Sequence, residues 1–268
     1  MKTDKDKYLI VTSFNQRGLN DYAKDFLNTY NLPFDLAVYS EDNLDLSNYN
    51  IKNFKFENLF DDSEFEKFIK GNPPTEFESR RNYDTCNENC SEFCYEHIGP
   101  DLKNIDPLKI CPHCDGNRIR LSAIMAHCMQ CSGTERHVKE CKKFSFKLFA
   151  QMNAIKKYKN NYEYILWIDA DCVFNNVSTD DFSKLVKDIM GDKMMGCLIR
   201  YKTYTETGFM IYNTNNKYLD EYFNEIRKIY LSHEIYYTQQ NHDCWIMDLI
   251  RERLEKKYKE IIHIDLSN

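Results

Sequence analysis

Apolar residues fall in short runs along the first part of the chain, with an amphipathic stretch between two of them. The runs at 7–14 and 34–40 predict strands that end in polar residues. Between them, four large apolar side chains recur at helical spacing: Tyr22, Phe26, Leu27 and Tyr30. Asn20 is a candidate cap for this helix. A strand, a helix and a strand at this spacing indicate a parallel sheet with a right-handed crossover, and ligands usually lie at the carboxyl ends of such strands.

The alternation continues after a polar, acidic stretch. Residues 43–80 suggest a short strand and a helix near 62–70. Beyond residue 143 the pattern predicts a series of further elements. These are helices over 144–157, 178–190, 216–231 and after Asp243, and strands over 164–168, 194–199, 208–213 and 261–265. This order of elements is typical of an α/β protein.

The composition fits one large globular domain or two small ones. Of the 268 residues, 42% are hydrophobic and 14% aromatic, which is enough for a sizeable core. No apolar run approaches the roughly 18 residues of a membrane span, and the N-terminal residues lead into a strand rather than a signal sequence. We therefore expect a cytoplasmic protein. The frequent use of Asn, Lys, Ile and Tyr hints at an AT-rich genome, microbial or viral, so the cytoplasm would be that of a cell or of a virus-infected host.

The distribution of charge weakens any case for tight nonspecific binding to nucleic acid. The net charge is -6, and no long segment is strongly basic. Such binding depends on many Lys and Arg contacts to phosphates. A local basic patch is compatible with this balance.

Two carboxylates stand one residue apart at the end of an apolar run. Asp169 and Asp171 follow the apolar residues 164–168, and three more apolar residues come after them. Side chains at i and i+2 on extended backbone point the same way, so the pair can share one hard divalent cation, or one can bind the cation while the other takes a sugar hydroxyl. A turn rich in Asp is the simpler alternative, but a turn does not require apolar runs on both sides.

Eight of the eleven cysteines lie between residues 86 and 141. Two Cys-x2-Cys pairs predict a first zinc site with four thiolate ligands: Cys111, Cys114, Cys128 and Cys131. A second site would use Cys86, Cys90, Cys94 and Cys141, with His97, His113, His127 or His137 as alternative ligands. Disulfides are the competing interpretation, which a reducing cytosol disfavours. We therefore expect a zinc-binding insertion over 81–141, within a domain formed by 1–80 and 142–268.

Two later segments complete a recognisable pattern. Gly208 begins an apolar run that closes on Asn213, and His242 with Asp243 precedes an apolar helix. Together with Asp169 and Asp171, these segments resemble the metal-dependent nucleotide-sugar glycosyltransferases of the GT-A fold. The resemblance covers roughly residues 7–70 and 144–265 and does not include the cysteine-rich insertion. It implies a Rossmann-like α/β fold with a mixed, mostly parallel sheet flanked by helices.

The resemblance also implies the roles of the site residues. A bound Mn2+ or Mg2+ would neutralise charge on the leaving diphosphate of a nucleotide-sugar donor. Its ligands would be Asp169, Asp171 and a late histidine, His263, although the Gly and Lys that often follow this histidine in the family are missing. The donor contacts would come from Asp169, Arg81, Lys147, Gly208 and Asn213, and the acceptor side from Asp243, Glu206 and His242.

Several alternatives remain open at the level of sequence. Glu206 or Asp243 would accept the acceptor's proton in an inverting enzyme, or stabilise an oxocarbenium-like centre in a retaining one. Solvated charges are the simpler interpretation of Arg81 and Lys147, and His242 can lie beside a helix cap without any chemistry. The chain can also be a zinc-ribbon module that binds nucleic acid or protein on a glycosyltransferase-like scaffold. A third interpretation is a glycosyltransferase that acts on a hydroxylated DNA base.

Overall fold

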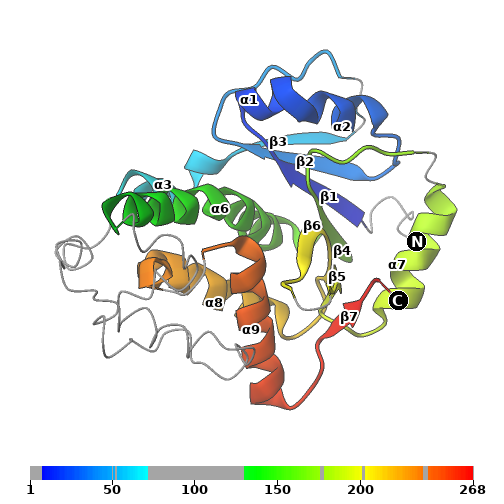
Figure 1. The fold of residues 1–268 in the computed structure, drawn as a ribbon. Coiled ribbons are helices and arrows are strands. Elements are labelled where there is room, and N and C mark those ends of the chain that lie inside the picture. The colour runs from blue at the N-terminus through cyan, green and yellow to red at the C-terminus, as the bar shows by residue number, and fades with distance from the viewer. Residues whose placement is uncertain are drawn as a thin grey trace.

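A seven-stranded sheet in the order β3-β2-β1-β4-β6-β5-β7 forms the centre of the protein (Figure 1). The computed structural model describes residues 8–49, 51, 53–71, 130–175, 178–200, 203–237 and 241–267, with backbone alone for 130–137 and parts of 179–185. Four of the six strand pairings are parallel, and the two made by β6 are antiparallel. The predicted fold class, an α/β protein with a mixed, mostly parallel sheet flanked by helices, is therefore confirmed.

The first βαβ unit follows the predicted order, with a different helix start. Strands β1 (Tyr8–Ser13) and β2 (Asp35–Ser40) are parallel neighbours. The connection between them is a helical segment made of α1 (Gln16–Gly18), a π-helical turn (Leu19–Ala23) and α2 (Lys24–Thr29). Its cap is Asn15 rather than Asn20, because the Asn15 side chain accepts a hydrogen bond from the Gly18 amide at 2.8 Å.

The short strand and helix expected in the polar region are both present. Strand β3 (Phe54–Asn58) extends the sheet beside β2, and a 3₁₀ turn (Leu59–Asp61) leads into α3 (Ser63–Lys70). Asp62 caps α3 through bonds from the amides of Glu64 and Phe65. The helix is amphipathic and buries Phe65 and Phe68 against the neighbouring helices.

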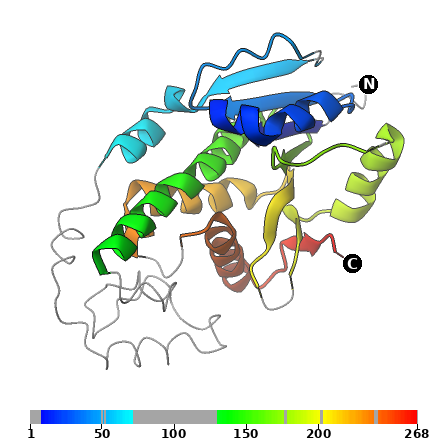
Figure 2. The ribbon, with the colours of Figure 1, turned by 45° about the horizontal axis from the view of Figure 1, so that its top comes forward.

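Helix α6 (Gln130–Tyr158) begins 14 residues earlier than the sequence pattern indicated. It runs without interruption past residue 141, so the expected domain boundary at that position lies inside a helix. Its inner face packs against the sheet together with α3, α8 (Leu219–Leu231) and α9 (Asp243–Tyr258), while the segment α1 to α2 and α7 (Thr179–Met190) cover the opposite face (Figure 2).

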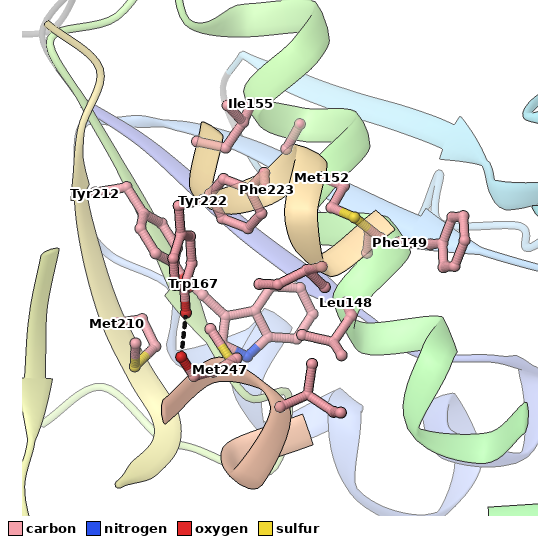
Figure 3. Packing of buried hydrophobic residues seen from close by; sticks show 14 of the residues in the cluster. Leu148, Phe149, Met152, Ile155, Trp167, Met210, Tyr212, Tyr222, Phe223 and Met247 are labelled. Atoms are coloured by element: carbon pink, nitrogen blue, oxygen red, sulfur yellow. Dashed lines mark hydrogen bonds between the residues drawn. The ribbon is translucent and has the colours of Figure 1, made fainter. Parts of the chain in front are cut away.

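The larger core lies between α6, α8 and α9 and the central strands (Figure 3). Trp167 of β4 (Tyr164–Ile168) is 2% exposed and occupies its centre. Leu148 and Met152 of α6 belong to the same cluster, and the Tyr222 hydroxyl donates to the Met247 carbonyl at 3.2 Å, which joins α8 to α9. The end of β4 that precedes Asp169 is therefore anchored in the larger core through Trp167.

Strand β6 (Glu206–Asn213) lies between β4 and β5 (Met195–Leu198) and is antiparallel to both. The last strand, β7 (His263–Asp265), is parallel to β5 at the edge of the sheet. A 3₁₀ turn (Glu234–Tyr237) follows α8. In the part of the chain that the structure describes, no helix combines the length and the apolar character that a membrane crossing requires.

Candidate active site

A pocket of about 760 Å³ opens over the carboxyl ends of β1, β2 and β4. This is the edge of a parallel sheet where ligands usually bind. Asp169, Ala170 and Asp171 form one part of its wall, and α6 forms another. The third part consists of residues at the ends of β1 and β2 and of Tyr22 from the π-helical turn.

Asp169 is held from three directions. The Trp167 indole nitrogen donates to its Oδ1 at 2.6 Å, and the Lys147 ammonium lies 2.9 Å from the same oxygen. The Asp169 amide also donates to the Gly208 carbonyl at 2.8 Å, which extends the pairing of β4 with β6. Burial raises the pKa of Asp169, and the Lys147 ammonium and the Trp167 indole offset this only in part. This carboxylate therefore has a fixed orientation.

Lys147 connects the four elements around the site. Its ammonium contacts Asp169, the Thr207 hydroxyl at 3.1 Å and Asp243 Oδ2 at 3.2 Å, and it lies 5.6 Å from the ring centroid of Trp167. Burial by itself would lower the pKa of Lys147, but attraction to Asp243 and Asp169 outweighs burial, so the pKa is raised. The lysine is thus a cation fixed between two carboxylates.

Asp243 lies inside the protein rather than at an open acceptor site. Its side chain is 9% exposed, and its Oδ2 also accepts a hydrogen bond from Thr207 at 2.7 Å. It is the first residue of α9, and His242 occupies the cap position without a side-chain hydrogen bond to the helix. The His242 ring instead meets Phe144 at 4.8 Å between centroids, and Phe144 lines the pocket.

Glu206 stands beside Asp169 and faces solvent. A Cβ placed on Gly208 would lie 3.2 Å from Asp169 Oδ2 and 3.2 Å from Glu206 Oε1, so these two oxygens are at most about 6.4 Å apart. Glycine at this position lets the two carboxylates approach the strand. The Gly208 amide donates to Glu206 at 2.9 Å, and Arg200 lies 3.0 Å from its second oxygen, with 41% of the glutamate side chain exposed.

Asp171 is the exposed carboxylate of the pair. It lines the pocket, and no lysine or arginine among the described residues pairs with it. Its closest polar contact in that set is a weak one from the Cys172 thiol at 4.0 Å. The carboxylate is therefore available to a cation that enters from the pocket.

The donor set fits a hard cation that the protein binds only in part. Within the described ranges, no group of three His, Cys, Asp or Glu side chains converges on one point. Mg2+ and similar ions often take one or two carboxylates and complete their shell with water and substrate phosphates. Asp171 can supply one such ligand, and Asp169 a second, weaker one, because its oxygens already bind Lys147 and Trp167.

The structure does not bring Asn213 to the pocket. The sequence pattern suggested that β6 ends at the site, but β6 is antiparallel to β4, so Phe209 pairs with Ile168 and Asn213 with Tyr164 at the opposite edge of the sheet. There, the Asn213 side chain accepts a hydrogen bond from the Asn215 amide at 3.1 Å and forms part of a turn. The start of the strand, with Gly208, lies at the site instead.

His263 is also distant from the carboxylate pair. Its strand is third from β4 in the sheet, which corresponds to about 14 Å at the usual strand spacing. Across the sheet, His263 pairs with Met195 of β5, Met195 pairs with Tyr212 of β6, and Tyr212 pairs with Ile165 of β4. His263 is therefore level with the start of β4, whereas the carboxylate pair follows its end. The His263 Nδ1 is paired with Glu255 at 2.6 Å. The structure therefore gives His263 a role in joining α9 to β7, not as a ligand beside Asp171.

Most of the predicted zinc ligands lie outside the described residues. These are Cys86, Cys90, Cys94, Cys111, Cys114 and Cys128, and Arg81 lies there too; the backbone of Cys131 is part of α6. Cys141 is fully buried in the larger core, and its thiol lies 3.7 Å from the Ile235 carbonyl. Burial raises the pKa of this thiol.

No protein-family model matches the chain, and no curated protein matches it. Among solved structures, the protein is similar to the apo crystal structure of mouse xyloside xylosyltransferase 1. That similarity has a TM-score of 0.44 and 9% sequence identity, and it covers 97% of this chain and 85% of the other. A likeness at this level assigns no activity, so any functional conclusion depends on the site itself.

Sequence reasoning missed three contributors to the site. Trp167 looked like a core residue, although its position two residues before Asp169 on a strand places both side chains on one face. Thr207 had no visible signal, because its partners Lys147 and Asp243 are remote in sequence. Tyr22 was assigned to an apolar stripe, yet it is 44% exposed and lines the pocket.

Proposed function

We propose that the protein is a glycosyltransferase that moves a sugar from a nucleotide-sugar donor to an acceptor hydroxyl, with a divalent cation at Asp171. The observation that carries this proposal is the placement of Asp169 and Asp171 on the wall of a 760 Å³ pocket, at the carboxyl end of β4. The pocket is large enough for a nucleotide-sized ligand. Sequence resemblance to the GT-A enzymes supports the same activity.

The two carboxylates have different tasks in this proposal. A cation at Asp171, when bound, supplies Lewis-acid stabilisation of negative charge on the leaving diphosphate. Asp169 is already oriented by Trp167 and Lys147, so it is suited to accept a hydrogen bond from a donor hydroxyl. The same contacts make Asp169 the weaker cation ligand of the two.

Glu206 is the carboxylate best placed to meet the acceptor. It is within about 6.4 Å of Asp169 and partly exposed, whereas Asp243 is buried and paired with Lys147. In an inverting reaction, Glu206 accepts the proton of the acceptor hydroxyl; in a retaining one, it stabilises positive charge on the sugar. Both courses require a carboxylate on the open side of the site.

Glu206→Gln should therefore lower the transfer rate by about 100-fold or more, which is within the usual range for loss of a general base or a charged stabiliser. Donor binding should change little, since the glutamine is isosteric and Asp169 and Asp171 remain. Steady-state transfer assays and nucleotide titrations measure the two effects. The matched control is Glu252→Gln, an equally exposed glutamate that is paired with Arg251. A transfer rate unchanged in the Glu206 variant would remove Glu206 from the reaction.

A screen of nucleoside diphosphates and nucleotide sugars for Mn2+-dependent thermal stabilisation tests the function as a whole. A ligand present at 100 times its Kd stabilises the folded state by about 2.7 kcal/mol, which should raise the Tm by several degrees. We expect such a shift only when nucleotide and Mn2+ are both present. No shift with any nucleotide, with or without the metal, would contradict the proposal.

A further inference from the structure

Four lysines of α6 line the same pocket as the carboxylate pair. They are Lys139, Lys142, Lys143 and Lys147, and the segment that carries them contains a single acidic residue, Glu140. Positions 143 and 139 precede Lys147 by four and eight residues, which corresponds to about 6 and 12 Å along a helix axis. Positive side chains therefore extend from the carboxylates along one wall of the pocket.

Two of these lysines are occupied by contacts within the protein. Lys147 lies between two carboxylates. The Lys142 ammonium donates to the carbonyls of Ile69 at 2.7 Å and Gly71 at 2.8 Å, where α3 ends. The last carbonyls of a helix have no partner within it, so Lys142 satisfies this end of α3 and joins it to α6.

Lys139 and Lys143 have no comparable contact. Both are exposed, and no carboxylate among the described residues forms an ion pair with either of them. The neighbouring Glu140 instead accepts a hydrogen bond from the Asn241 side-chain amide at 2.9 Å. The Lys143 ammonium lies 5.5 Å from the ring centroid of Phe144, which also lines the pocket. Two cations on the pocket wall are thus available to a ligand.

The donor of the proposed reaction does not require these two charges. A cation at Asp171 already neutralises its diphosphate. The wall that carries the free lysines begins instead beside the proposed acceptor carboxylate, because Lys147 contacts Asp169, and Glu206 is within about 6.4 Å of Asp169. An acceptor that lies between Glu206 and α6 would therefore meet Lys143 first and Lys139 one turn further on.

We propose that Lys139 and Lys143 bind a phosphate monoester on the acceptor, so that the sugar is transferred to a hydroxyl of a phosphorylated small molecule. This inference rests on the proposed function and specifies its acceptor class. The phosphate anchors the acceptor and takes no part in the transfer itself.

The charge of the site favours this group over other anions. A phosphate monoester carries about −1.5 to −2 charges at pH 7 and three strong acceptor oxygens, so it can bind both ammoniums at once. A carboxylate has a single charge and would leave one lysine without a partner. Tight binding of nucleic acid depends on many phosphate contacts, whereas the described wall of the pocket offers two free lysines.

Calorimetric titration with glucose, glucuronate and glucose 6-phosphate tests the inference, because these probes share one ring and differ in charge. The whole protein is first saturated with Mn2+ and the nucleoside diphosphate that the thermal screen identifies. We expect glucose 6-phosphate to bind at least about tenfold more tightly than glucuronate or glucose, since hydrogen bonds between charged groups are the stronger ones. Lys139→Met and Lys143→Met should each weaken the binding of glucose 6-phosphate by about tenfold. The double variant should bind it no more tightly than glucose.

Lys156→Met is the matched control, because Lys156 is an exposed lysine of the same helix that does not line the pocket. This variant should bind all three probes as tightly as the unmodified protein. The substituted lysines are exposed, and the Tm of each variant without ligand reports on its folding.

Three results would overturn the inference while the glycosyltransferase proposal stands. Glucose 6-phosphate could bind no more tightly than glucose. The Lys139 and Lys143 variants could lose affinity for the nucleoside diphosphate itself, which would assign these lysines to the donor. A single-stranded oligothymidylate could bind more tightly than glucose 6-phosphate, which would assign them to nucleic acid. Absence of Mn2+-dependent binding of any nucleotide would overturn both proposals.

Discussion

Asp171→Asn should abolish Mn2+-dependent nucleotide binding while the protein remains folded. Asp171 is exposed on the pocket wall and has no lysine or arginine partner among the described residues, so its charge can be removed without leaving a buried ion unpaired. Loss of an outer-shell partner of a metal ligand usually costs 10 to 100-fold in metal affinity. Loss of a direct ligand charge should cost at least about 100-fold, which titration calorimetry with Mn2+ and the nucleoside diphosphate that the thermal screen identifies would measure.

The control for this variant is Asp192→Asn. Asp192 is an exposed aspartate in the turn before β5, at the edge of the sheet opposite the pocket. The Asp192→Asn variant should bind the nucleotide with the same affinity as the unmodified protein. If Asp171→Asn bound Mn2+ and nucleotide with undiminished affinity, the cation would not be held by this carboxylate.

Lys147→Met should destabilise the protein by about 3 kcal/mol. Removal of one partner from a buried ion pair typically costs about 3–5 kcal/mol, because the remaining charge is left without compensation. Here, two carboxylates would lose their cation, but the ammonium retains some solvent contact, with 16% of the side chain exposed, which places the expected effect at the lower end. Urea denaturation would show the loss as a lower midpoint.

Two further variants make this result specific. Lys143→Met, one turn earlier on α6 at an exposed position, should change stability by less than about 0.5 kcal/mol. Asp243→Asn in the Lys147→Met background should restore part of the lost stability, because it removes one of the two uncompensated charges. A loss below about 1 kcal/mol in Lys147→Met, or no recovery in the double variant, would show that the lysine does not neutralise these carboxylates.

Local patterns in the sequence predicted the elements that build the pocket. Strands β1 and β2 lie within one residue or two of the predicted runs, and β4 ends at Ile168, directly before Asp169, as its apolar residues indicated. These predictions succeed because each strand is buried on both faces, so its composition alone marks it. The position of Asp169 and Asp171 at a ligand-binding edge follows from the same pattern and from the rule for parallel sheets.

The direction of β6 could not be read in the same way. The apolar composition of a segment does not indicate the direction in which its strand runs in the sheet. Gly208 and Asn213 were therefore equally suitable for the site until the pairing with β4 was known. The contacts of Lys147 also depend on three separate elements that converge in space. Such contacts cannot be predicted from the spacing of residues in the sequence. The sequence of a helix also does not distinguish a lysine exposed to solvent from one that is paired with a carboxylate.

The strand order β4-β6-β5 also has a consequence for protein synthesis. β6 inserts between two strands that are made before it, so the nascent chain carries β4 with one edge unpaired until residue 213 has left the ribosome. Lys147 and Asp169 emerge early, but the buried partner of the lysine, Asp243, comes last. A ribosome that stalls before this residue would display the carboxylate pair on a chain in which Lys147 still lacks its contact with Asp243.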